Sequence, residues 1–265
     1  MSQLPDVLAR IVEGRRRHLA AEWQRPGPRN LLLDEGPVQT AETNSFLAAL
    51  EARRGRAVIA EVKMGSPRLG SLAGRFDPEA QARLYAEHGA ACLSVVVEPD
   101  FFHGSYELLE RCREASGLPA IAKDFAVSPR QLLWARDAGA SAVLLMAVLF
   151  ESFEDLTSYA WMARGLGLVP LVEVDSAADL PKLRGAPWEL VGVNNRDLRT
   201  FEVSLARSIE LAKRLPKEAL KVAESGISGR EQVERLAAAG FDAFLIGESL
   251  LTAEDPAAKL EELVG

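Results

Sequence analysis

Charged and amide side chains stand at the ends of several short apolar runs in this sequence, where they could supply acid–base chemistry. Two lysines and two glutamates in one site would provide both a proton donor and a proton acceptor. Because unpaired charge is costly to bury, a set of this size indicates function more than packing. Single pairs such as Glu61–Lys63 or Asp124–Arg196 could still be purely structural. The polar set comprises Glu61, Lys63, Lys123, Glu173, Asn194 and Arg196.

Small residues end two further apolar runs, and they are suited to binding an anion. Ser225 and Gly226 follow Glu224 at the end of the seventh run, and Gly247 and Glu248 end the last one. Both sequences lead into helical patterns, so backbone N–H groups and a helix N-terminus could surround a phosphate. The alternative is that the two glycines only turn the chain.

Eight short apolar runs, each followed by a helical pattern, fill the chain from residue 57 onward. The runs, which begin with residues 57–63, are continuously apolar, and this indicates strands buried on both faces of a parallel sheet. Glycines that fit left-handed helix C-caps precede six of the runs. These glycines are Gly89, Gly117, Gly139, Gly167, Gly185 and Gly240.

Units of about 26 residues predict a (β/α)8 TIM barrel over residues 57–265. A doubly wound open sheet is the alternative, and it is disfavoured because no G-x-G-x-x-G turn follows the first run. In a barrel the carboxyl ends of all strands meet at one mouth, so the polar set should converge there. Residues 1–56 contain helical patterns at 5–24 and 44–51. They predict a helical extension that covers one end of the barrel, although the pattern does not say which end.

Composition excludes several classes of protein. The 265 residues include 48% hydrophobic and 26% charged residues, which is ordinary for a globular domain. A net charge of −7 argues against a nucleic-acid partner. No apolar run approaches the roughly 20 residues of a membrane span, and the N-terminus lacks a signal-peptide core, so we expect a cytoplasmic protein. Cys92 and Cys112 are expected to be buried thiols, and the absence of metal-binding motifs predicts no metal site.

Seven motifs in order resemble those of the indole-3-glycerol-phosphate synthase family. They are IAEVKMGSPRLG, FFHGSYELL, IAKDF, LVEV, GVNNRDL, VAESGIS and FLIGESL. The resemblance covers essentially the whole chain, and only Met64 and Gly65 depart mildly from a polar or basic pair. It implies the ring closure of 1-(2-carboxyphenylamino)-1-deoxyribulose 5-phosphate to indole-3-glycerol phosphate in tryptophan biosynthesis, with loss of CO₂ and water. It implies no cofactor and a small phosphorylated substrate. We also expect a monomer or weak homo-oligomer, although the sequence itself does not determine the oligomeric state.

The resemblance also implies roles for individual residues. Lys123 corresponds to the general acid at the ketone, and Glu173 to the general base. Which of Glu173, Glu61 and Lys63 handles the dehydration proton stays open. Asn194 and Arg196 correspond to residues that orient the substrate and hold Glu173. The phosphate-binding positions are Ser225, Gly226, Gly247 and Glu248, and the pocket-lining positions are Ser66, Phe102, Leu144 and Leu198.

Two further expectations follow from the residues themselves. Lysines that lie close together should depress one another's pKa toward neutrality. A related phosphate-binding barrel, phosphoribosylanthranilate isomerase, is the main alternative, but it needs a cysteine and an aspartate at strand ends. Neither Cys92 nor Cys112 stands beside an aspartate at such an end. A non-catalytic barrel is a second alternative, and it would not be expected to keep both Lys123 and Glu173.

Overall fold

Eight parallel strands close into a barrel in the computed structural model, which describes residues 6–22, 37–40, 42–67, 70–197, 200 and 202–265. Each strand pairs with its sequence neighbour in the barrel, and the last strand pairs with the first. The strands are β1 (Ala57–Val62), β4 (Cys92–Val96), β5 (Ala120–Lys123), β6 (Ala142–Met146), β7 (Val169–Val174), β8 (Leu190–Asn194), β9 (Leu220–Glu224) and β10 (Ala243–Ile246). The predicted (β/α)8 barrel is therefore confirmed. A small antiparallel hairpin, β2 (Gly65–Ser66) with β3 (Gly70–Ser71), follows the first strand.

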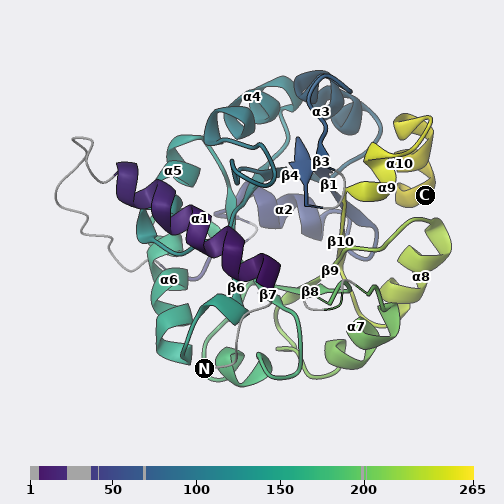
Figure 1. Ribbon diagram of the computed structural model, residues 1–265. Coiled ribbons are helices and arrows are strands. Elements are labelled where there is room, and N and C mark those ends of the chain that lie inside the picture. The colour runs from purple at the N-terminus through teal and green to yellow at the C-terminus, as the bar shows by residue number, and fades with distance from the viewer. Residues whose placement is uncertain (1–5, 23–36, 41, 68–69, 198–199, 201) are drawn as a thin grey trace.

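Helices surround the barrel (Figure 1). They are α3 (Pro78–Glu87), α4 (Tyr106–Ser116), α5 (Pro129–Asp137), α6 (Phe153–Gly165), α7 (Leu205–Ala212), α8 (Arg230–Ala238), α9 (Glu248–Leu251) and α10 (Pro256–Val264), with short 3₁₀ helices η1 (Ala147–Leu149) and η2 (Leu180–Leu183). Side chains such as Asp77 and Ser128 accept hydrogen bonds from first-turn N–H groups, and a proline follows both of these caps. The six predicted glycines all have φ between +70° and +96°.

One connection departs from the expected pattern of eight helices. The sequence predicts an α-helix between β7 and β8, but the structure has only the 3₁₀ helix η2 in this connection. The connecting segment is short and contains Pro181, Gly185 and Pro187. Proline removes backbone donors and glycine disfavours helix, so this segment cannot form several helical turns.

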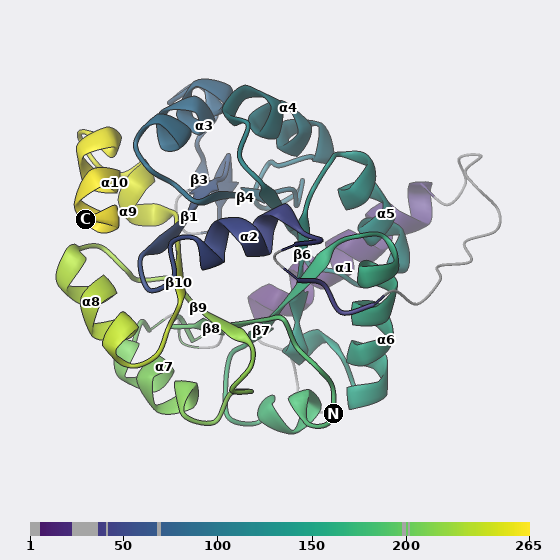
Figure 2. The same cartoon turned by 180° about the vertical axis from the view of Figure 1, so that it is seen from behind.

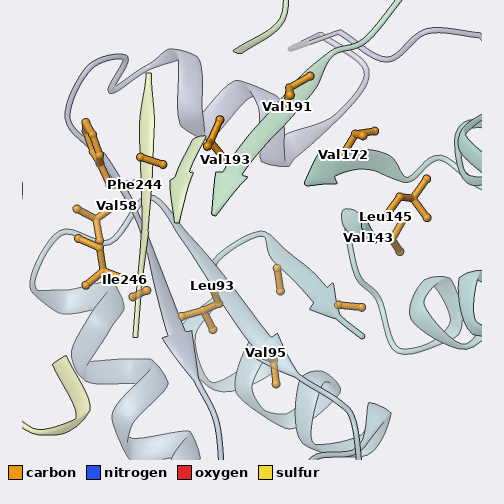
Figure 3. Packing of buried hydrophobic residues seen from close by; sticks show 14 of the residues in the cluster. Val58, Leu93, Val95, Val143, Leu145, Val172, Val191, Val193, Phe244 and Ile246 are labelled. Carbon is orange, nitrogen blue, oxygen red and sulfur yellow. The ribbon is translucent and has the colours of Figure 1, made fainter. Parts of the chain in front are cut away.

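The core has two parts, on the outside and on the inside of the sheet. Alternate strand residues such as Val58, Leu93 and Val191 point outward and pack under the helices (Figure 3). The other set points into the barrel, where Ile59 and Leu171 are among the side chains that fill its lower part. Both sets are fully buried, as expected for a parallel sheet covered on both faces. Cys92 and Cys112 are buried free thiols, as predicted.

The two N-terminal helices lie at opposite ends of the barrel. Helix α1 (Asp6–Glu22) crosses the mouth at the carboxyl ends of the strands in Figure 1, and α2 (Ser45–Glu51) crosses the other end in Figure 2. Asn44 caps α2 and donates its side-chain N–H groups to the backbone carbonyls of Ser141 and Gly167. The N-terminal extension thus covers both ends of the barrel, whereas the sequence predicts that it covers one end. No described helix is long and apolar enough to cross a membrane.

Candidate active site

A cavity of about 610 Å³ lies at the carboxyl ends of the strands, beneath α1. Val7, Leu8 and Ile11 of α1 line its apolar side together with Phe102 and residues of β6. The residues predicted from the sequence line the same cavity, apart from Leu198, which lies outside the described residues. Those lining it are Glu61, Lys63, Ser66, Phe102, Lys123, Leu144, Glu173, Asn194, Arg196, Ser225, Gly226, Gly247 and Glu248.

Strand geometry explains why the charged groups meet. Glu61, Lys123, Glu173 and Glu224 occupy inward-facing positions at the upper ends of β1, β5, β7 and β9. Side chains in a barrel strand alternate between inside and outside, so residues near the ends of different strands converge in one layer. We call Glu61, Lys63, Lys123, Glu173 and Glu224 the charged layer.

Ion pairs connect the charged layer. Lys123 Nζ lies 2.7 Å from Glu224 Oε2 and 3.6 Å from Glu173 Oε2. Lys63 Nζ lies 2.8 Å from Glu61 Oε1, so this predicted pair is present. Asn194 donates to Glu173 Oε1 at 3.3 Å. The geometry therefore places one ammonium between two carboxylates, with an amide orienting the second of them.

The surroundings of Lys123 contradict the expectation that lysines depress one another's pKa. Burial alone would lower the pKa of Lys123, but the carboxylates of Glu224, Glu173 and Glu61 outweigh burial and raise it. The carboxylates of Glu224 and Glu173 lie 2.7 and 3.6 Å from Lys123 Nζ, and no contribution from Lys63 is among the causes of the shift in its pKa. Lys123 is therefore a charged ammonium throughout the physiological pH range, and it would release its proton only to a strongly basic group such as a developing alkoxide.

Glu173 has the opposite tendency. Burial and the neighbouring Glu224 carboxylate raise the pKa of Glu173 to about 8, although Lys123 and the Asn194 hydrogen bond oppose this rise. A carboxyl group that titrates near the working pH can both accept and release a proton. Glu61 behaves differently: burial would raise its pKa, but Lys63 and Lys123 lower it, so it remains ionised.

Glu224 is a member of the charged layer to which sequence reasoning gave no role. Only 1% of its surface is exposed, and it makes the shortest contact to Lys123. A signal was present, because Glu224 ends an apolar strand directly before Ser225, in the same way as Lys123 ends β5.

Small residues form a second polar region at the cavity edge, which we call the anion corner. It comprises Ser225, Gly226, Ser228, Gly247 and Ser249. Ser225 and Gly226 both have φ of +69°, and the Asn195 amide donates to the Ser225 carbonyl at 2.8 Å, which fixes this turn. The carboxylate of Glu248 lies 3.3 Å from Arg196 NH2, so only its backbone could serve an anion.

A buried polar network fixes α1 over the mouth. Arg15 donates through Nε to Asp124 Oδ1 at 3.0 Å, and Tyr106 and Gln131 each donate to Asp124 Oδ2 at 2.8 Å. Asp124 thus pairs with Arg15 and not with Arg196, the partner considered from the sequence. Because Asp124 directly follows Lys123, α1 is tied to the strand end that carries the ammonium.

Two phenylalanine rings, Phe102 and Phe125, form an aromatic wall of the cavity, and the carboxylate of Glu98 holds the turn that carries Phe102. Glu98 accepts hydrogen bonds from the backbone N–H groups of Asp100, Phe101 and Phe102 at 2.8 to 3.0 Å. This turn presents Phe102 beside Phe125, with ring centroids 5.9 Å apart. The result is an apolar surface beyond the ends of β4 and β5, on the side of the cavity that carries Lys123, and it is suited to an aromatic ring.

Other chemistries find less support in the described part of the chain. It contains no group of three or more His, Cys, Asp or Glu side chains that could hold a metal ion. Cys92 directs its thiol to the Phe46 carbonyl near α2, and Cys112 contacts the Pro78 carbonyl on the outside of the barrel. Neither thiol lines the cavity, so the acid–base pair of the isomerase alternative is not formed.

The amino-acid sequence matches one family of known proteins over almost its whole length. The family model described as indole-3-glycerol phosphate synthase matches residues 8–263. An indole-3-glycerol phosphate synthase from Variovorax paradoxus is 41% identical over 265 residues, which cover 98% of this chain and 99% of that protein. An indole-3-glycerol phosphate synthase from Burkholderia ambifaria is 40% identical, with the same shares covered.

Solved structures that are similar to the chain support the fold alone. Thiamine phosphate pyrophosphorylase from Pyrococcus furiosus matches with a TM-score of 0.57 at 16% identity, covering 80% of this chain and 95% of that one. The 3-hexulose-6-phosphate synthase from Salmonella typhimurium matches with a TM-score of 0.61 at 15% identity, covering 78% and 96%.

Proposed function

Because the chain belongs to the indole-3-glycerol phosphate synthase family, we propose that its cavity closes the indole ring of 1-(2-carboxyphenylamino)-1-deoxyribulose 5-phosphate. The observation that carries this proposal is the position of Lys123, an ammonium paired with the Glu224 carboxylate and next to Glu173, in a cavity that Phe102 and Leu144 also line. A direct test supplies this substrate to the purified protein and follows the fluorescence of the indole product. Absence of indole formation by a folded protein would disprove the proposal.

The ring closure needs a proton donor. The ring carbon that carries the carboxylate attacks the C2′ ketone carbon, and the carbonyl electrons move to oxygen. In our proposal the Lys123 ammonium gives its proton to that oxygen as charge develops there. The carboxylate then leaves as CO₂, and its electron pair restores the aromatic ring. The apolar wall around Phe102 and Leu144 favours this loss, because a poorly solvated carboxylate is destabilised relative to neutral CO₂.

The dehydration needs both an acid and a base. The hydroxyl group leaves as water after receiving a proton, and a base removes the C1′ proton so that the indole double bond forms. We assign the base to Glu173, since its raised pKa allows proton transfer in both directions near neutral pH. Lys63 and Glu61 are the alternative carriers of the dehydration proton. Asn194, which donates to Glu173, would hold the carboxylate in position.

The substrate phosphate is assigned to the anion corner. On a chain of net charge −7, a phosphate needs local N–H donors and a nearby cation, and Arg196 lies next to this corner. The aromatic ring would then lie at the other end, against Phe102 and α1. We further propose a cytosolic enzyme that acts as a monomer or weak homo-oligomer on this small molecule, with no cofactor, nucleic-acid or membrane partner.

Charge at the anion corner should weaken substrate binding. Replacing Ser228, which is exposed at the cavity edge, by aspartate places a negative charge close to the proposed phosphate. A like charge at partly exposed sites costs about 1 kcal/mol, so we expect KM to rise about fivefold while kcat changes little. Ser228→Asn is the matched neutral control. Equal KM values for the two variants would place the phosphate elsewhere.

Deletion of residues 1–43 should raise KM and leave the barrel folded. The deletion removes Val7, Leu8 and Ile11 from the cavity but keeps Asn44, which caps α2. Loss of about 1–3 kcal/mol of apolar contact predicts a KM that is about 5–150 times higher. Circular dichroism checks the fold, and Arg17→Ala on the exposed face of α1 is the control. A wild-type KM in the deletion variant would exclude a binding role for α1.

A further inference from the structure

Gly192 is the middle inward-facing residue of β8, between Leu190 and Asn194. It is fully enclosed by the barrel, and its backbone is not in the left-handed region that favours glycine. Glycine weakens a strand, and inside one it marks a place where another group approaches closely. Glycine is therefore needed at this position because a side chain would occupy space that another group fills, and not because of its backbone conformation.

Glu224 occupies that space. A Cβ atom built on Gly192 would overlap Glu224 Oε1, and it would lie 3.3 Å from both Glu224 Cδ and Leu171 Cδ1. Glu224 is only 1% exposed, and its Oε1 has no hydrogen-bond partner among the described residues. The other oxygen, Oε2, lies 2.7 Å from Lys123 Nζ.

We propose that Gly192 is a positioning residue: the slot left by its missing side chain seats Glu224 so that Glu224 holds Lys123 beside Glu173. This inference rests on the proposed function of the cavity. A buried oxygen without a partner is unfavourable, so the carboxylate would not adopt this position for its own stability. The contacts that keep it there are the ion pair to Lys123 and a side-chain hydrogen bond with Glu173.

A methyl group at position 192 would displace the carboxylate toward the cavity. Either the Lys123–Glu224 distance would then increase, or Lys123 would move together with Glu224. In both cases the separation between Glu224 and Glu173 would change. Because burial and Glu224 together raise the pKa of Glu173, the titration of Glu173 should respond. Other charged groups that face this cluster are Glu61 in β1, Lys63 directly after β1, and Arg196 after β8.

The experiment compares Gly192→Ala, Glu224→Ala and the double variant. In Gly192→Ala we expect kcat to fall at least tenfold with KM changed less than threefold, and the pH profile of kcat to shift. In the Glu224→Ala background the slot is empty, so the added methyl group should change neither kcat nor the unfolding midpoint. Val193→Ala, on the outward face of the same strand, is the control: it should lower stability and leave the pH profile unchanged.

Two measurements are independent of turnover. Carbon-13 NMR of glutamate carboxyl groups should show the high-pKa carboxyl titrating at a different pH in Gly192→Ala, and thermal unfolding should show that the two substitutions are not additive. Additive destabilisation together with an unchanged titration would overturn the positioning role. If the wild-type protein fails to form indole, the proposed function fails, while these two measurements still decide the role of Gly192.

Discussion

Replacing Lys123 with methionine is expected to lower kcat by about 10²–10⁴-fold, because a positioned acid contributes about that much. The change corresponds to about 3–5 kcal/mol of barrier. KM should change little, since the proposed phosphate contacts lie on the opposite strands. The rate at which indole fluorescence appears at saturating substrate measures kcat for each variant. Lys221→Met is the control, since Lys221 is a half-buried lysine of β9 that does not line the cavity.

Lys123→Arg separates proton donation from charge. Arginine keeps a cation between Glu224 and Glu173, but its planar guanidinium has a different shape and would not direct an N–H group to the atom that Lys123 Nζ reaches. We therefore expect little recovery of kcat relative to the methionine variant. A near wild-type rate would show that only the positive charge matters, and the donor would then have to be reassigned, first to Lys63.

Glu173→Gln is expected to lower kcat by about 10²–10⁴-fold and to change the pH dependence. Glu173 must be ionised to act as a base, and its pKa is raised to about 8, so the wild-type kcat/KM should rise as pH increases toward 8. The Glu173→Gln variant should not show this rise of kcat/KM with pH, because glutamine has no proton to lose in this pH range. A rise that persists in Glu173→Gln would assign the titration to another residue.

Stability provides an independent check on Glu173. Its folded pKa lies above its ordinary value of 4.5, so the folded state retains the proton that the unfolded chain releases. The resulting stabilisation is complete below pH 4.5 and is lost as pH rises to about 8. Chemical denaturation at several pH values should show a flatter slope over this window for Glu173→Gln than for the wild type.

Local patterns were enough to predict most of the architecture. Apolar runs and glycine C-caps gave the eight strands, and the polar residues at their ends gave the cavity lining, since a barrel has only one carboxyl-end mouth. The helix predicted between β7 and β8 was wrong, because the prolines and glycine of that segment were given too little weight. Glu224 received no role, although its place at the end of β9 carried the same signal as Lys123 at the end of β5.

Contacts between distant parts of the chain could not be predicted in this way. Arg15 and Asp124 are 109 positions apart, and no periodic pattern connects a helix of the extension to one strand end. The direction of the pKa shift at Lys123 was also missed, because it depends on which of several nearby charges is closest. Glu173 is in β7 and Glu224 is in β9, across the barrel from β5, and only the inward direction of their side chains brings them to Lys123.

The charged layer has a consequence for how the protein could acquire new activities. The aliphatic and aromatic clusters that hold the barrel together lie below and around this layer. Replacing paired buried charges by apolar groups of similar volume is often neutral or stabilising, so the layer is where stability is given up for activity. Its residues come from separate strand ends, and because removing one member of a buried pair is costly, they would be exchanged as pairs. The same barrel could therefore evolve a different reaction at its mouth while the rest of the sequence stays as it is.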